Sequence, residues 1–141
     1  MDLATGQVTE EQLDDRPGDF GRINESYTGL PARYGYLMEM DGEGNAEEPT
    51  YGKALLKYDL ETGRCTSHQL GASVRGGEPT FVQSGDDEDD GYVMTFVHDE
   101  ETNQSSFVIL DGKNFDTEPL ATIRLPERVP YGAHGNWVPL Q

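Results

Sequence analysis

Three histidines are the side chains of this chain best suited to metal chemistry: His68, His98 and His134. No two of them stand at a spacing such as HxH or HxxxH, which would place two imidazoles on one metal ion. We interpret His68 and His98 as surface or strand-end histidines. His134 differs, because small residues flank it in residues 131–135 and leave space around its ring. It is therefore the candidate metal ligand.

Glu78 is the second candidate for a functional role. It lies between Gly77 and Pro79, and His134 follows it after 56 residues, close to an internal repeat length of 57. Equivalent positions in neighbouring repeats lie side by side in a repeat protein. A carboxylate that accepts the ring N–H of a ligand histidine fixes the tautomer of that histidine and raises its basicity. The alternative is a loop carboxylate with no such role.

Other chemical motifs are weak or incomplete. The acidic run of residues 86–91 resembles the start of a calcium loop, but the twelfth position from Asp86 is Val97 rather than a bidentate Glu. We expect this run to be a solvated hairpin tip. No phosphate-binding loop is followed by a helix, and no nucleophile elbow is present.

Composition limits the partners of the chain. The 141 residues include 27 Asp and Glu against 10 Lys and Arg, a net charge of −17. This balance excludes a nucleic-acid partner and a polybasic membrane anchor, both of which need clustered cations. A single cysteine, Cys65, cannot form an internal disulfide and fits a reducing compartment. The first residues lack the charged and apolar regions of a signal peptide, so we expect a cytoplasmic protein.

An internal repeat indicates how the candidate residues are positioned. Residues 2–13 and 59–70 share seven of twelve positions. In both copies an Asp-Leu pair precedes a Thr-Gly turn, where Gly6 and Gly63 supply the positive φ that a tight turn needs. A looser third copy runs through residues 108–112 and returns through residues 120–125.

The spacing of apolar segments predicts an all-β fold. We expect strands over residues 8–15, 33–40, 53–59, 80–83, 92–98, 106–110 and 134–140, separated by Gly, Pro, Asn and Asp. Four strands in about 50 residues are typical of one blade of a β-propeller. Residues 1–141 would then form an incomplete single domain of about two and a half blades. Such an array cannot close a ring, so its outer faces and edges need further partners.

Several ordered segments resemble the C-terminal part of the carotenoid cleavage oxygenase family, which includes carotenoid and lignostilbene dioxygenases and the retinal-pigment-epithelium isomerase. Residues 20–24 are similar to the family's F-P-R-I-N, 33–36 to R-Y-G-Y, 77–82 to G-E-P-x-F-V, 88–93 to E-D-D-G-x-hydrophobic, and 128–135 to R-V-P-x-G-F-H-G. Ala133 departs from this pattern, because many members carry Phe there.

The resemblance implies a fold, a cofactor and a reaction. It implies a seven-bladed β-propeller that holds Fe(II) through four histidines and uses O₂ to cleave an alkene of a carotenoid, apocarotenoid or stilbene. His134 would be the last iron ligand, and Glu78 the carboxylate that orients it. The other three ligands would belong to N-terminal blades that precede these residues. The resemblance also implies peripheral membrane contact, for collecting apolar substrates.

One histidine cannot hold iron alone, so we expect the isolated chain to bind no stoichiometric iron and to have no oxygenase activity. Two alternatives remain open. The chain could be a non-catalytic β-module that binds a partner or copies of itself through its open edges. It could also be the complementing half of a split enzyme, with the missing N-terminal blades on a second chain.

Overall fold

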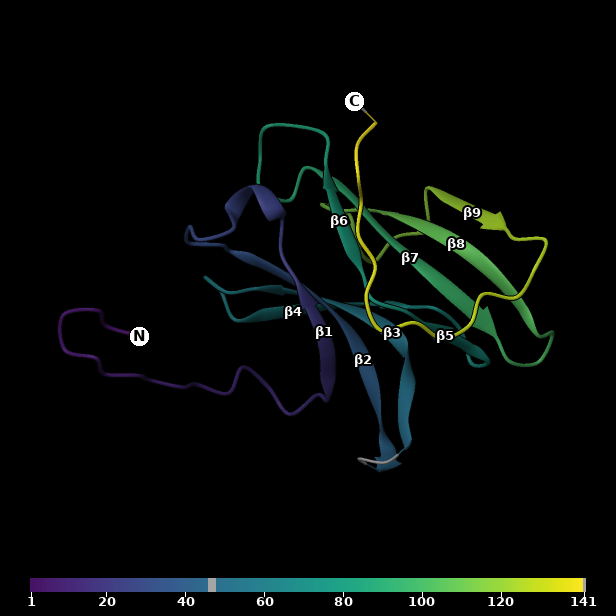
Figure 1. Cartoon of the computed structure of the whole chain (residues 1–141), viewed down its shortest axis with the longest axis horizontal. Helices are drawn as coiled ribbons and strands as arrows, with labels where there is room; N and C mark the ends of the chain where they lie inside the picture. The colour runs from purple at the N-terminus through teal and green to yellow at the C-terminus, as the bar shows by residue number, and fades with distance from the viewer. Residues whose placement is uncertain (46–47, 141) are drawn as a thin grey trace.

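The computed structural model describes residues 1–45 and 48–140, and it confirms the predicted all-β fold (Figure 1). The described residues contain one short 3-10 helix, η1 (Glu25–Tyr27), and nine strands. The strands are β1 (Gly18–Arg22), β2 (Tyr34–Asn45), β3 (Glu48–Asp59), β4 (Arg64–Gln69), β5 (Val74–Gly76), β6 (Thr80–Gln83), β7 (Gly91–Asp99), β8 (Gln104–Asp111) and β9 (Ala121–Arg124). No helix in the described part of the chain is long and apolar enough to cross a membrane.

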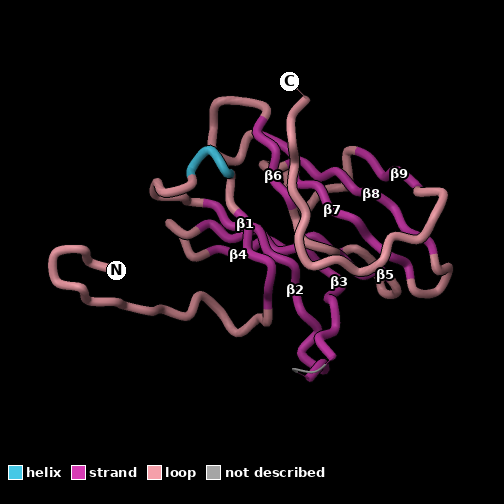
Figure 2. Tube along the Cα trace, in the orientation of Figure 1, coloured by secondary structure: helices cyan, strands magenta, loops and turns pink. Residues whose placement is uncertain are grey.

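The strands form two antiparallel sheets, and Figure 2 shows them as two groups of magenta tube segments. The first sheet has the order β1-β2-β3-β4, so that consecutive strands pair. The second has the order β5-β7-β8-β9, and β6 also pairs with β7. Strands β5 and β6 pair with opposite ends of β7, through Arg75 with His98 and through Phe81 with Val93. They are therefore two halves of one edge strand, and the break between them contains Glu78.

The core lies between the two sheets. Strands β2 and β3 contribute Tyr36, Met38 and Leu55, which pack against apolar side chains of the second sheet. The rings of Tyr36 and Phe81 stack with their centroids 5.2 Å apart. Glycine is required at position 91, because a Cβ atom there would lie 2.3 Å from the carbonyl oxygen of Val82.

The repeated turns have the predicted geometry. Gly6 and Gly63 have φ angles of 72° and 69°. Each donates its N–H to the carbonyl of the Asp four residues earlier, Asp2 or Asp59, over 2.8 Å. Only the second turn joins two strands, β3 and β4. The same local sequence therefore forms the same turn whether or not a hairpin follows.

Two predicted strands are wrong. Residues 8–15 and 134–140 have no strand assignment. Side chains rather than a ladder hold the first segment against β3, because the Tyr58 hydroxyl donates to Asp14 over 2.9 Å. In the second segment the N–H of Gly135 donates to Glu78 instead of to a strand partner. Alternating sequence alone could not show that both segments lack a neighbouring strand here.

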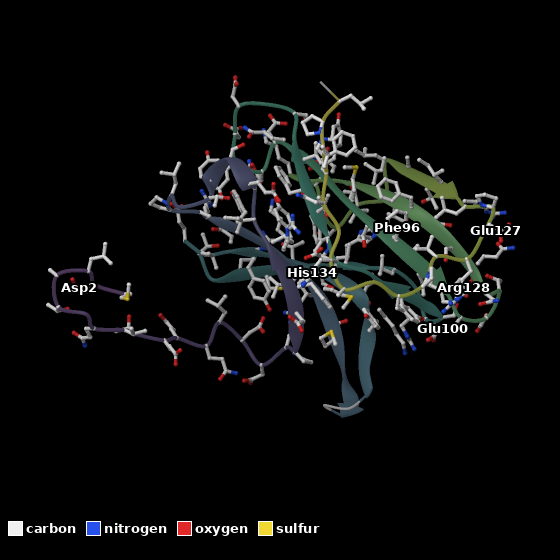
Figure 3. All side chains as sticks on the ribbon, in the orientation of Figure 1. Asp2, Phe96, Glu100, Glu127, Arg128 and His134 are labelled. Atoms are coloured by element: carbon white, nitrogen blue, oxygen red, sulfur yellow. The ribbon has the colours of Figure 1, made fainter. Side chains whose placement is uncertain are left out.

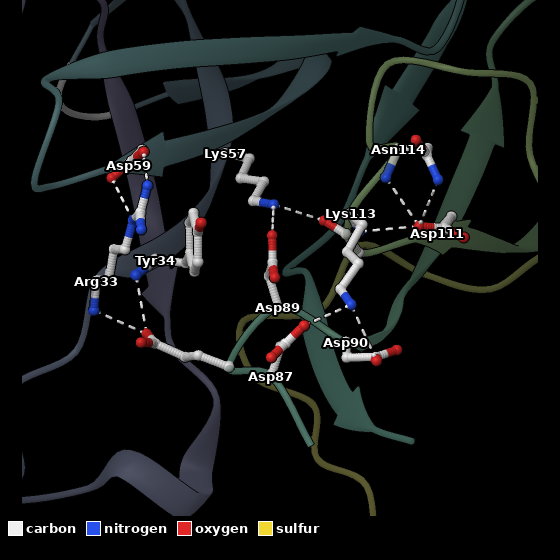
Figure 4. Close-up of polar contacts among 12 residues, drawn as sticks. Arg33, Tyr34, Lys57, Asp59, Asp87, Asp89, Asp90, Asp111, Lys113 and Asn114 are labelled. Carbon is white, nitrogen blue, oxygen red and sulfur yellow. Dashed lines mark hydrogen bonds and ion pairs between the residues drawn. The ribbon is translucent and has the colours of Figure 1, made fainter. Parts of the chain in front are cut away.

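The acidic run is more than the solvated tip that we expected (Figure 4). The Glu88 carboxylate accepts the backbone N–H groups of Arg33 and Tyr34, over 2.8 and 2.9 Å. Asp89 pairs with Lys57 at 2.7 Å, and these side chains are only 15% and 9% exposed. The turn between β6 and β7 therefore fastens the second sheet to the first. The prediction of a solvated tip is wrong for these two carboxylates.

The second sheet also carries apolar side chains on the face that points away from the first sheet. Phe96 and Ile123 are each 49% exposed there. The rings of Phe96 and Phe107 lie 4.9 Å apart between centroids. Strand alternation places these residues opposite the core-facing Val93, Val97 and Val108. Both faces of this sheet are therefore partly apolar, although only one is covered by the first sheet.

Candidate functional site

The structure brings Glu78 and His134 together, although 56 residues separate them. His134 Nδ1 lies 3.2 Å from Glu78 Oε1. The N–H of the next residue, Gly135, donates to Glu78 Oε2 over 2.6 Å. Figure 3 labels His134 near the centre of the molecule, where the C-terminal segment passes the two sheets. The carboxylate thus holds both the ring and the backbone beside it.

The two partners differ sharply in burial. The Glu78 side chain is 5% exposed, whereas the His134 side chain is 78% exposed. Burial by itself would raise the pKa of the Glu78 carboxyl, but hydrogen bonds from Gly135, His134 and Arg22 together hold that pKa below its ordinary value. An ionised carboxylate accepts the Nδ1–H of a neutral imidazole, which leaves the lone pair on Nε2. The second ring nitrogen is therefore available to a ligand on the exposed side.

Strand β1 supplies a ring that packs against His134. Phe20 meets the imidazole edge to face, with centroids 5.6 Å apart. Phe20 has a φ of 55°, and the pairing of β1 with β2 shifts register between Asp19 and Arg22. Bulges of this kind re-aim side chains at the edge of a sheet. The sequence motif around residue 20 did not reveal this contact, because a positive φ at Phe has no simple local signal.

Aromatic side chains continue away from Phe20. Its ring stacks on Tyr51 at 6.4 Å, and Tyr51 stacks on Tyr131 at 4.7 Å. Tyr131 belongs to the same C-terminal segment as His134. A row of aromatic rings therefore runs from the exposed imidazole through Phe20 and Tyr51 to Tyr131.

His68 and His98 each stand one residue before the end of a strand, β4 or β7, as expected of strand-end histidines, but both are buried rather than on the surface. His68 pairs with Leu55 across β3 and β4 and meets Phe115 edge to face. Burial lowers the pKa of His68. His98 Nδ1 lies 3.3 Å from Ser105 Oγ, and its ring meets Tyr131. Their polar sequence neighbours concealed the fact that each ring points into packed structure.

A wide cleft of the described structure does not contain the candidate site. Its volume is about 620 Å³, and it lies along β4, β8 and β9, with His68, Asp99 and Arg124 among its lining residues. Neither Glu78 nor His134 lines it. The candidate site is therefore defined by the contact between its residues rather than by this cleft.

Comparison with known proteins places the chain in a family. The family model described as "RPE65: Retinal pigment epithelial membrane protein" matches residues 1–139. The chain belongs to this family. It is 38% identical to a zeaxanthin 7,8(7',8')-cleavage dioxygenase of Crocus sativus, over 98% of this chain and 38% of that protein. It is 39% identical to the 9-cis-epoxycarotenoid dioxygenase NCED1 of Oryza sativa subsp. japonica, over 98% of this chain and 22% of that protein.

Solved structures of the RPE65 family share the fold. A cobalt-substituted Synechocystis apocarotenoid oxygenase superimposes with a TM-score of 0.86 at 29% identity, over 98% of this chain and 29% of that one. A chimera of that oxygenase with RPE65 also gives 0.86, at 28% identity. The chain thus spans well under half the length of the family members that it matches. The family resemblance inferred from the sequence is confirmed.

The donor set of this RPE65-family chain fits part of a metal site. No group of three or more His, Cys, Asp or Glu residues within 1–45 and 48–140 could hold a metal ion. His134 offers one neutral imidazole nitrogen, which is a suitable donor for ferrous iron. A carboxylate on the other ring nitrogen is the usual outer partner of a ligand histidine. These residues fit one ligand position, and further ligands would have to come from elsewhere.

Proposed function

We propose that this chain is part of an Fe(II)-dependent dioxygenase that cleaves alkene bonds of carotenoids, apocarotenoids or stilbenes with O₂. In this proposal His134 is one iron ligand and Glu78 is the carboxylate that orients it. The observation that carries the proposal is the 3.2 Å contact from His134 Nδ1 to a buried carboxylate, which leaves Nε2 exposed. Carotenoid dioxygenases among the relatives support the reaction class.

Each residue of the site has a defined task. Glu78 Oε1 accepts the Nδ1–H of His134 and so fixes the tautomer that presents Nε2 as a donor. Glu78 Oε2 accepts the Gly135 N–H and fixes the backbone beside the ring. Phe20 limits the tilt of the imidazole from its other side. Bound ferrous iron would supply the activation of O₂ for the cleavage.

The proposal includes a larger fold, the seven-bladed β-propeller. A four-stranded and a five-stranded sheet already pack against each other in this chain, and the second has an apolar outer face at Phe96 and Ile123. A further blade would cover that face. The remaining blades would also supply the ligands that His134 needs.

The test replaces the matching segment of the Synechocystis apocarotenoid oxygenase with this chain and measures iron per protein and alkene cleavage. We expect the chimera to retain iron and His134→Ala to lose both iron and activity. His68→Gln serves as the matched control, because this buried histidine packs against Phe115, away from the segment that carries His134, and should leave iron content unchanged. Full iron occupancy in His134→Ala would refute the ligand assignment.

The chain alone gives the complementary result. With one ligand, it should bind no stoichiometric Fe(II) and should not cleave an apocarotenoid. One iron per chain together with cleavage would show that the chain is complete in itself. A chimera that folds but neither binds iron nor cleaves substrate would favour the non-catalytic module.

A further inference from the structure

Arg22, at the end of β1, contacts both sides of the Glu78–His134 pair. Its Nη1 lies 3.3 Å from Glu78 Oε1 and donates to the Gly135 carbonyl oxygen over 2.9 Å. Its Nη2 donates to Glu25 and, over 3.3 Å, to Asn136 Oδ1. The Arg22 side chain is 19% exposed. One guanidinium therefore joins the first sheet, the interrupted edge strand of the second and the segment that carries His134.

The segment that carries His134 needs restraint from outside. No strand pairs with residues 134–140, and Gly132 and Gly135 flank the histidine with open space around each Cα. Glycine has the widest backbone freedom of any residue. The N–H of Gly135 is fixed by Glu78, and its carbonyl is fixed by Arg22. Together these two contacts hold both sides of the Gly135 α-carbon.

The positive charge of Arg22 also stabilises the buried carboxylate of Glu78. A carboxylate that is 5% exposed pays a large desolvation cost unless it is paired and hydrogen-bonded. Gly135 and the imidazole of His134 contact Glu78 without a permanent charge, whereas Arg22 brings a permanent positive charge. A guanidinium suits this place because its planar set of donors can serve several acceptors at fixed angles. A lysine would match the charge but not the planar arrangement of several N–H donors.

We propose that Arg22 is a positioning residue, which sets the ring orientation and tautomer of His134 through Glu78 and the Gly135 carbonyl. The significance of this role for iron rests on the proposed function. The positioning itself is a property of the 141-residue chain and does not require a metal. Arg22 acts through other residues and touches no reacting atom.

The test is nuclear magnetic resonance of the metal-free chain at alkaline pH, where a free imidazole is neutral. Long-range ¹H–¹⁵N correlations report which nitrogen of His134 carries the proton. We expect the Nδ1–H form to dominate in the wild type and the Nε2–H form to gain population in Arg22→Gln. Amide exchange at Gly135 should accelerate about tenfold or more, because the bond from the Gly135 N–H to Glu78 loosens when Glu78 loses its charged partner. Arg22→Lys should restore part of the tautomer bias.

Arg64→Gln is the matched control. Arg64 is an exposed arginine on β4, at the opposite edge of the same sheet. Its replacement should leave the His134 correlations and the Gly135 exchange rate unchanged. Unchanged amide shifts in β7 and β8 would show that each variant is folded. If Arg22→Gln disturbs that sheet, Arg22→Lys and the milder Glu25→Gln, which removes an outer contact of Arg22, carry the test.

The results separate this inference from the proposed function. A wild-type tautomer and wild-type Gly135 exchange in Arg22→Gln would overturn the positioning role. A changed tautomer in Arg22→Gln of the metal-free chain, together with a folded chimera that binds no iron, would support the positioning role and refute the iron ligand. Loss of the tautomer bias in Glu78→Gln, but not in Arg22→Gln, would assign the whole effect to the carboxylate and would also overturn the proposal.

Discussion

Two carboxylate clusters connect the parts of this molecule, and they differ in whether the partner of the buried carboxylate is itself buried. At the acidic turn, Asp89 and Lys57 are both largely buried, and the ammonium also donates to the Gly112 carbonyl over 2.7 Å. At the other cluster, Glu78 is buried but its partner His134 is 78% exposed. In the first cluster the two charged groups form an ion pair with each other. The second leaves Nε2 of His134 without a contact in the described part of the fold. This difference separates a cluster that only stabilises the fold from one that offers a ligand position.

The largest expected effect is on stability at the acidic turn. Asp89→Ala should lower the free energy of unfolding by about 3–5 kcal/mol, because it leaves the Lys57 ammonium buried without its counter-charge. Urea denaturation of the chain measures this loss. Asp86→Ala, in the exposed part of the same turn, is the control and should change stability by less than about 0.5 kcal/mol. Equal effects of the two substitutions would show that the pairing of Asp89 with Lys57 does not stabilise the contact between the sheets.

The next effect is on metal affinity at the second cluster. Glu78→Gln should weaken Fe(II) binding by the chimera by about 10–100-fold, because an amide no longer enforces the Nδ1–H tautomer. Iron retention against a chelator series measures the change. Glu25→Gln, which alters another carboxylate in contact with Arg22, should have a smaller effect. Wild-type retention in Glu78→Gln would remove this residue from the site.

A smaller effect concerns pH and His68, which belongs to neither cluster. Burial lowers its pKa in the folded chain, so the unfolded chain binds a proton more readily. Stability should therefore be full above the ordinary histidine pKa of about 6.5 and fall below it, with a slope of at most about 1.4 kcal/mol per pH unit from this group. Denaturation at several pH values tests this. His68→Gln should flatten the slope between pH 7 and 5.

The smallest effect in the isolated chain concerns Phe96, on the outer face of the second sheet. Because Phe96 is half exposed and its ring packs on Phe107, Phe96→Ser should lower the stability of the isolated chain by about 1 kcal/mol. In the chimera, a neighbouring blade would bury this ring, and the same substitution should cost several-fold more. Thermal melts of both proteins compare the two values. An equal, small effect in both would argue against a covering blade.

The sequence predicted most of the strands because their patterns are local. Alternating and aromatic runs marked β2, β3, β6, β7 and β8, and the repeat marked the turns at Gly6 and Gly63. It failed at residues 8–15 and 134–140, which pair with no strand in the described part of the chain. Local pattern reports the tendency to be a strand, but pairing is decided by tertiary context.

The candidate site was partly predictable for the same reason. The spacing of Glu78 and His134 matched the repeat, and the structure places them in contact. Arg22 had no such periodic partner, so its bridging position emerged only in three dimensions. The burial of His68 and His98 and the pairing of Asp89 with Lys57 were also missed, because polar neighbours in sequence do not show which way a strand side chain points.

The most direct test of the account is an anomalous diffraction map, recorded at the iron absorption edge, from crystals of the iron-loaded chimera. The account predicts an iron peak bonded to His134 Nε2, with Glu78 still on Nδ1. An iron peak held by other residues, with His134 pointing away from it, would contradict the central claim.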